Sequence, residues 1–101
     1  MKLLQVDFPS QGPFGEAMAQ AYKDLAEDIA QEKGLIWKIW TENKETQEAG
    51  GIYLFADEEN AKRYLDKHSK RLEGFGVQGI RARIFDVNGP LSRIDKAPIQ
   101  F

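Results

Sequence analysis

The alternation of apolar and polar residues predicts a strand and then a helix in the first third of the chain. Residues 2–8 place leucine, valine and phenylalanine on one side and mostly polar side chains on the other, which is the period of a strand with one buried face. Between Phe14 and Lys33, apolar residues recur every three or four positions, which predicts one helix. Gly34 follows at a position where glycine commonly ends a helix.

The rest of the chain predicts two strands, a second helix and a last strand. Residues 35–43 are rich in β-branched and aromatic side chains, and residues 52–56 form another apolar run. The polar stretch between them, which ends in Glu-Ala-Gly-Gly, predicts a loop, so we expect these strands to pair as an antiparallel hairpin. Asp57 is a suitable N-terminal cap for a helix that ends at Gly74, and residues 77–87 alternate again.

This order of elements, βαββαβ, predicts a ferredoxin-like α+β fold. Right-handed crossovers then place both helices on one face of a four-stranded antiparallel sheet. The chain has 101 residues, enough for one domain and not two. We therefore expect residues 1–101 to form a single domain, with residues 1–87 as the βαββαβ core and residues 88–101 as a C-terminal tail.

The sheet face without helices predicts a homodimer. On the expected register this face carries large aromatic side chains, Trp40 among them, together with charges of both signs, which is the composition of an interface. We expect it to pack on the sheet of a second copy; the alternative is a solvated sheet. The same register predicts which side chains face the helices: Leu4, Val6, Phe8, Trp37, Ile39, Ile52, Leu54, Ile80, Ala82 and Ile84.

The C-terminal tail is too apolar to be a free segment. It contains Leu91, Ile94, Ile99 and Phe101 within residues 88–101. We expect it to pack on the partner subunit, where it could cover a sheet edge. The alternative is packing on its own subunit.

Composition excludes several classes of function. The formal net charge is −2, which argues against nucleic acid or an anionic membrane as a partner. The absence of cysteine excludes disulfides, thiolate metal sites and a cysteine nucleophile, and a single histidine excludes a histidine-rich metal site. No stretch is long and apolar enough to span a membrane. We therefore expect a cytoplasmic protein without a bound metal.

The one histidine, His68, is the main candidate for chemistry. No phosphate loop, dinucleotide fingerprint or nucleophile elbow is present. His68 lies on the apolar face of the second helix, one turn after Tyr64. An imidazole placed over a sheet can act as an acid or a base, because burial and neighbours move its pKa across neutrality. The alternative is a structural histidine that hydrogen-bonds a carbonyl.

Aromatic residues predict a pocket for a small ligand under the helices. The expected register directs Trp37 toward Tyr22, Phe14 and Tyr64, and apolar walls with few polar groups are typical of small-molecule sites. The alternative is that these aromatics are plain core. Trp40 is expected at the subunit interface instead.

Several segments together resemble the YdhR-type monooxygenases, a family of the dimeric α+β barrel superfamily. The resemblance spans nearly the whole chain, with its segments in the family's order. They are the Gly-Pro-Phe-Gly of residues 12–15, LIWKIWTE of residues 35–42, EAGGIYLF of residues 48–55, YLDKHSKRL of residues 64–72 and FDVNGPLSRI of residues 85–94.

The resemblance implies a homodimer and a reaction without a cofactor. In such a dimer two sheets form a barrel, and each subunit has a pocket between its helices and its sheet. Relatives of the quinol-oxidising kind let a bound phenol or anthrone react directly with oxygen, without a metal or flavin. On this chain the resemblance implies His68 as the base, Trp37 and Tyr64 as residues that orient the ring, and Tyr22 and Phe14 as residues that shape the pocket.

Two alternatives stay open at this point. Haem-degrading enzymes resemble this fold and use a helix histidine with an asparagine on the first strand, but that strand offers only Asp7 here. A ligand-binding dimer without catalysis is the alternative from another class, and product formation would discriminate it from an enzyme.

Overall fold

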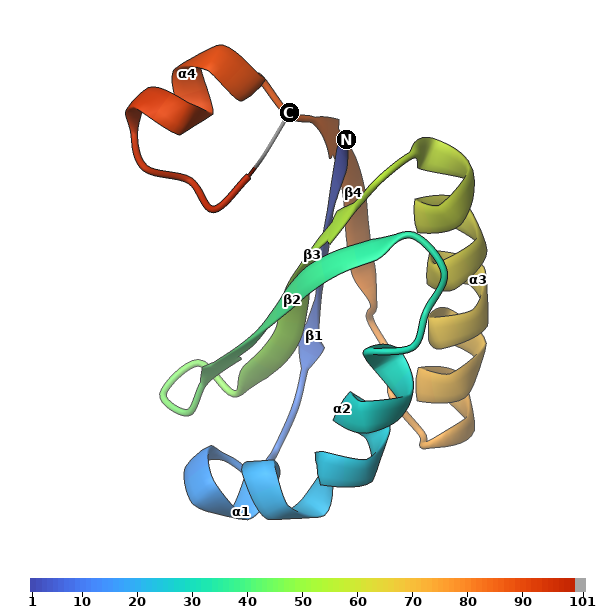
Figure 1. Cartoon of the computed structure of the whole chain (residues 1–101). Helices are drawn as coiled ribbons and strands as arrows, with labels where there is room; N and C mark the ends of the chain where they lie inside the picture. The colour runs from blue at the N-terminus through green and yellow to red at the C-terminus, as the bar shows by residue number, and fades with distance from the viewer. Residues whose placement is uncertain (100–101) are drawn as a thin grey trace.

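The computed structural model describes residues 1–99, which form four strands and four helices (Figure 1). Phe101, predicted to be part of an apolar tail, lies outside the described residues. In chain order the elements are β1 (Lys2–Pro9), α1 (Gly15–Ala21), α2 (Lys23–Ile29), β2 (Leu35–Asn43), β3 (Glu48–Phe55), α3 (Glu58–Gly74), β4 (Arg81–Asp86) and α4 (Gly89–Ile94).

The strands form one antiparallel sheet in the order β2-β3-β1-β4, which is the predicted ferredoxin-like arrangement. Helices α1, α2 and α3 cover one face of this sheet, and α4 lies apart from them near the far end (Figure 1). The core between sheet and helices consists of buried side chains from β1, α2, β3 and α3: Leu4, Val6, Ile29, Tyr53, Phe55, Ala61 and Tyr64.

The predicted first helix is interrupted. Instead of one helix from Phe14 to Lys33, the chain forms α1 and α2, which meet at Tyr22. Tyr22 has φ −110° and ψ 15°, outside the helical region, although its amide still donates to the Met18 carbonyl at 3.0 Å. Apolar periodicity could not reveal this break, because the spacing of apolar residues continues through it.

The Glu-Ala-Gly-Gly stretch is strand and not turn, which corrects the sequence prediction. Residues 48–51 belong to β3, and the turn of the hairpin is made by residues 44–47. Gly50 lies against β1 so closely that an added Cβ would be 2.0 Å from the carbonyl oxygen of Val6. Glycine is needed here because the two strands approach closely. In the sequence alone, a glycine pair of this kind looks the same as a turn.

The predicted register is correct for β1 but inverted for β2 and β3. Leu4 lies opposite Tyr53, and Tyr53 lies opposite Lys38, so these three side chains share the helix-covered face. A register shift between Leu35 and Trp37 sets the phase of β2. Trp40 therefore faces the helices, whereas the side chains predicted there lie on the other face: Trp37, Ile39, Ile52 and Leu54.

The tail contacts its own subunit. Asn88 caps α4 by accepting from the amide of Leu91 at 3.2 Å. Beyond α4, the carbonyl of Pro98 accepts from Nε1 of Trp37 at 3.0 Å, and Ile99 is buried. Packing of the tail on a partner subunit stays a prediction.

Among residues 1–99, no helix combines the length and the apolar character that crossing a membrane requires.

We expect Gly50→Ala to lower the free energy of unfolding by about 2 kcal/mol, because the new methyl group would overpack the β1–β3 contact. Urea denaturation measures the change. Gly74→Ala is the matched control: nothing lies within 4 Å of its Cβ position at the end of α3, so it should raise stability by about 0.5 kcal/mol. Equal stability of the two variants would contradict the close approach at Gly50.

Candidate functional site

A cavity of about 860 Å³ lies between the sheet and the helices. The strands β1, β2 and β3 supply its floor, α1, α2 and α3 supply its walls, and residues 9–13 and 75–79 form its rim. The side chains that line it inside the rim are Val6, Phe8, Met18, Tyr22, Leu25, Lys38, Trp40, Gln47, Ala49, Tyr53, His68 and Leu72. This set is mainly apolar and contains few polar groups, the usual composition of a small-molecule site.

Lys38 is the only charged side chain that lines this cavity in the described part of the chain. Its ammonium lies 3.4 Å from the ring centroid of Trp40 and 4.7 Å from that of Tyr53, so two π-faces contact it. None of the ion pairs formed among residues 1–99 includes it. Burial, with a smaller effect of the Arg71 charge, lowers the pKa of Lys38 to about 7.

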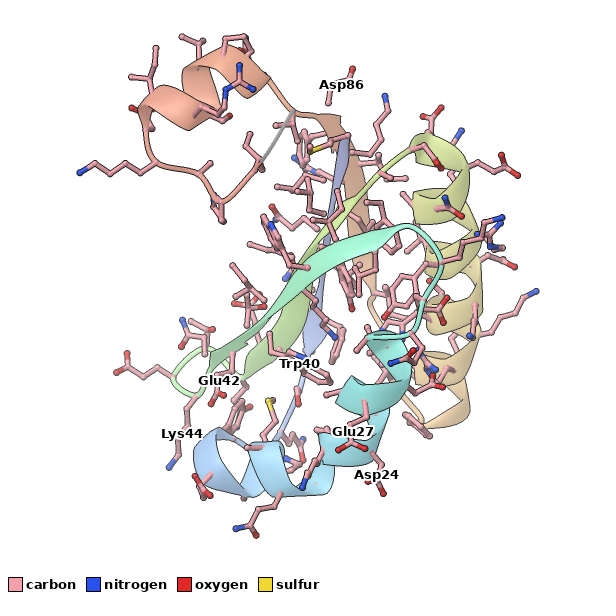
Figure 2. All side chains as sticks on the ribbon, viewed as in Figure 1. Asp24, Glu27, Trp40, Glu42, Lys44 and Asp86 are labelled. Carbon is pink, nitrogen blue, oxygen red and sulfur yellow. The ribbon has the colours of Figure 1, made fainter. Side chains whose placement is uncertain are left out.

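Trp40 and Tyr22 form an aromatic wall beside this lysine. Their ring centroids are 6.2 Å apart and the rings are inclined by 18°, a stacked pair. Figure 2 shows the Trp40 side chain between the sheet and helix α2. The break at Tyr22 between α1 and α2 thus lies where the helical layer contacts the pocket.

His68 is buried at the cavity wall and held by Arg71. The Arg71 Nη2 and Nε atoms lie 2.9 and 3.3 Å from the imidazole Nδ1, and Arg71 Nη1 donates to Asp28 at 3.1 Å. A guanidinium has no acceptor, so Nδ1 must accept and the ring proton resides on Nε2. Burial, followed by the charges of Lys38 and Arg71, lowers the pKa of His68 to about 3.

This environment makes His68 a neutral hydrogen-bond donor at ordinary pH. Its one lone pair, on Nδ1, is already used by Arg71. A general base needs a free lone pair within reach of the substrate proton. The geometry therefore disfavours the base role that the sequence suggested, although the predicted position of His68 in the pocket agrees with the structure.

Two buried tyrosines support the site from behind. The hydroxyls of Tyr53 and Tyr64 are 3.2 Å apart, and the Tyr64 ring stacks on His68 with centroids 5.1 Å apart. Burial raises the pKa of both phenols, that of Tyr64 to about 12. Both therefore stay neutral and fix the orientation of the histidine ring.

The structure brings only part of the predicted site together. His68 and Tyr22 line the cavity, and Tyr64 packs behind His68 without lining it. Phe14 precedes α1 and is not among the lining residues in the described chain. Trp37 does not face the helices, because the register shift near the start of β2 turns it to the opposite face.

The sequence analysis missed three residues that line the cavity: Lys38, Trp40 and Tyr53. All three were assigned to the wrong face because the predicted register of β2 and β3 was inverted. The one available signal was Lys38 between two tryptophans in the apolar first half of β2, because lysine is rarely buried in such a segment unless a partner or ligand compensates its charge. Within residues 1–99, no three side chains of histidine, cysteine, aspartate or glutamate come together as a possible metal site.

Comparisons with known proteins agree with the fold. The model of the family described as "Putative mono-oxygenase ydhR" matches residues 3–98. A structure titled as a putative antibiotic biosynthesis monooxygenase from Deinococcus radiodurans superposes with a TM-score of 0.59 at 12% identity, covering 87% of this chain and 93% of that chain. A variant of SnoaB, titled a cofactor-independent oxygenase from Streptomyces nogalater, gives 0.58 at 12% identity, covering 86% and 93%. No protein with a curated description matches the chain.

We expect His68→Gln to reduce the loss of stability on acidification. The pKa of His68 is lowered from 6.5 to about 3 on folding, so below about pH 6.5 the unfolded chain binds a proton that the folded protein does not. The folded protein therefore loses stability as the pH falls from 6.5 toward 3. Between about pH 7 and about pH 5, His68 should account for roughly 1 kcal/mol of the loss in the free energy of unfolding, a figure reduced for partial solvent access.

Urea unfolding at these two pH values measures the effect. A glutamine amide oxygen can still accept from Arg71, so the variant retains that hydrogen bond. An identical loss in wild type and variant would contradict the buried, neutral state of His68.

Proposed function

The chain belongs to the ydhR mono-oxygenase family, and we propose that it oxygenates a small phenol-like or quinol-like aromatic compound with molecular oxygen and no cofactor. The observation that carries this proposal is the pocket. It combines an aromatic wall, a lysine that pairs with no carboxylate of residues 1–99 and a neutral histidine donor in one cavity of about 860 Å³. A cavity of this size is in the range that drug-sized ligands occupy.

The geometry assigns distinct roles to the pocket residues. A planar substrate can stack on the wall formed by Trp40 and Tyr22, where ring contacts orient it. The Nε2 proton of His68 can donate to a substrate oxygen, and Lys38 can balance a negative charge. The apolar side chains of the lining can pack on the ring and keep part of it from water.

The reaction balances with oxygen as the only oxidant. Deprotonation gives a substrate anion, which transfers one electron to O2, and the two radicals combine through a new C–O bond to form a peroxide. Where that carbon carries a hydrogen, loss of water leaves a carbonyl. One oxygen atom enters the product and the other leaves as water, while the substrate supplies all four electrons. The protein has to bind, deprotonate and shield the substrate.

We also propose that the protein is a homodimer that packs sheet on sheet and acts in the cytoplasm. Helices α1, α2 and α3 cover only one face of the sheet (Figure 1). Some apolar side chains on the opposite face are open to solvent in the single chain. Ile39 is 52% exposed and Phe85 is 43% exposed. Burying them against a second copy would remove this apolar surface from water. The lack of cysteine suits a reducing compartment.

We expect oxygen uptake above the no-protein rate when the purified protein is supplied with anthrones, hydroquinones or simple phenols in the dark. The aromatic wall and the lysine should bind and ionise such compounds, so an oxygenated product should accumulate with the uptake. A chelator should leave the rate unchanged. Binding without any uptake across the panel would favour a ligand-binding dimer over an enzyme.

We expect Ile39→Lys to shift a dimer to monomers, because a charge on the outer sheet face would have to be buried in the interface. Sedimentation velocity measures the mass. Lys62→Ala on the exposed side of α3 is the control and should leave the dimer intact. A wild-type protein that sediments as a monomer would contradict the sheet-on-sheet dimer.

A further inference from the structure

Lys38 is a partly buried cation that forms no ion pair among residues 1–99. It lies in the middle of β2 and reaches into the cavity among aromatic rings. An ammonium with no carboxylate partner, partly removed from water, is unfavourable unless a ligand or a function compensates for it. Cation–π contacts with Trp40 and Tyr53 supply only part of that compensation.

Among the lining residues that the structure describes, no side chain other than Lys38 can accept a proton near neutral pH. His68 uses its lone pair to accept from Arg71, and the lining residues of the described chain include no aspartate or glutamate. The Tyr53 hydroxyl lies 3.2 Å from that of Tyr64, and burial raises its pKa. Within residues 1–99, the Lys38 amine after loss of its proton is therefore the one base that lines this cavity.

We propose that Lys38 is the catalytic base of this pocket and the counter-ion of the substrate that it ionises. The inference rests on the proposed oxygenation and names both the residue and the substrate class. The substrate is an aromatic compound with an acidic hydroxyl, of the phenol, quinol or enolised anthrone kind. Binding brings that hydroxyl to Nζ, where the O–H bond breaks and an N–H bond forms. The neutral amine becomes an ammonium, and the neutral substrate becomes an anion of the opposite charge.

The electrostatics of the cavity favour the neutral amine before the proton transfer and the ion pair after it. Before substrate binds, burial and the nearby Arg71 charge favour the neutral amine, and the pKa of Lys38 is about 7. After proton transfer, the anion and the ammonium attract each other strongly because little water screens them. The titratable groups next to Lys38 in the described chain are Tyr53, His68 and Arg71. Tyr22 stacks on Trp40, which Lys38 contacts, and Glu42 lies four residues farther along β2.

Of these groups, the two charged ones are already engaged. Glu42 accepts from the Gly15 amide at 2.7 Å at the start of α1, and Arg71 is paired with Asp28. Neither therefore offers Lys38 a permanent counter-charge. A substrate anion would fill that place, which explains why the pocket pairs a lone lysine with a histidine that can only donate.

The first test uses 4-nitrophenol, which absorbs visible light only when ionised, and it needs no oxygenation. At about pH 6, where free 4-nitrophenol is mostly protonated, wild-type protein should increase the phenolate band. Lys38→Met should abolish the increase, whereas Lys38→Arg should retain it, because a permanent cation still stabilises the anion. Lys62→Met, an exposed lysine on α3, is the control and should behave as wild type.

The second test measures oxygen uptake with an anthrone. Lys38→Met and Lys38→Arg should both lose on the order of 100-fold or more in kcat, since neither side chain accepts a proton. The wild-type kcat/KM should rise with pH through about 7, as Lys38 becomes neutral. In Lys38→Met this rise should move to the pKa of the substrate hydroxyl, and added methylamine should restore part of the rate. A purely structural role for Lys38 would change neither the pH profile nor the response to amine.

The two tests distinguish a failure of the role proposed for Lys38 from a failure of the proposed oxygenation. A phenolate band equal in wild type and Lys38→Met, including no band in either, overturns the role of Lys38 whether or not oxygen is consumed. A lysine-dependent band without oxygen uptake from any substrate keeps Lys38 as the counter-ion of the ionised hydroxyl and overturns the proposed oxygenation. Uptake that Lys38→Met leaves unchanged keeps the oxygenation and overturns the base.

Discussion

The pairing of β3 with both of its neighbours determines what the rest of this structure can do. Tyr53 lies opposite Leu4 on one side and Lys38 on the other, so the three side chains share the helix-covered face of the sheet. Because side chains alternate along a strand, this one alignment also brings Trp40 under the helices and sends Trp37 to the opposite face. A slip of β2 by one residue would turn Trp37 and Ile39 toward the helices and remove Lys38 from the cavity. The site is therefore a property of register more than of any local motif.

The sequence predicts the fold better than the site, and the reason is visible strand by strand. In β1 the two faces differ in polarity, so alternation assigns Leu4 and Val6 to the core correctly. In β3 the run Ile-Tyr-Leu-Phe is apolar on both faces, and in β2 the register shifts between Leu35 and Trp37. In these two strands the alternation of residue types therefore does not indicate which face is buried. The helix break at Tyr22 was equally hidden, because apolar spacing continues through it.

The pocket needs few polar groups because the chemistry proposed for it asks for little from the protein. When the substrate itself supplies the electrons, catalysis reduces to orientation, removal of one proton and exclusion of water. The proposed mechanism divides these tasks among separate residues. The stacked pair of Trp40 and Tyr22 orients, Lys38 receives the proton, and His68 donates from a ring fixed by Arg71. The two tyrosines behind the histidine keep that ring from turning.

The opposite orientation of the two tryptophans gives this protein a pair of independent spectroscopic reporters. Trp40 lies under an ammonium in the cavity, so its fluorescence responds to whatever displaces or neutralises that charge. Trp37 lies on the far face of the same strand and donates its indole N–H to Pro98, so its emission reports on the attachment of the C-terminal segment. The two indoles lie on opposite faces of β2, so each one senses a different environment. Their emission can thus respond to the pocket and to the outer face without any label added to the chain.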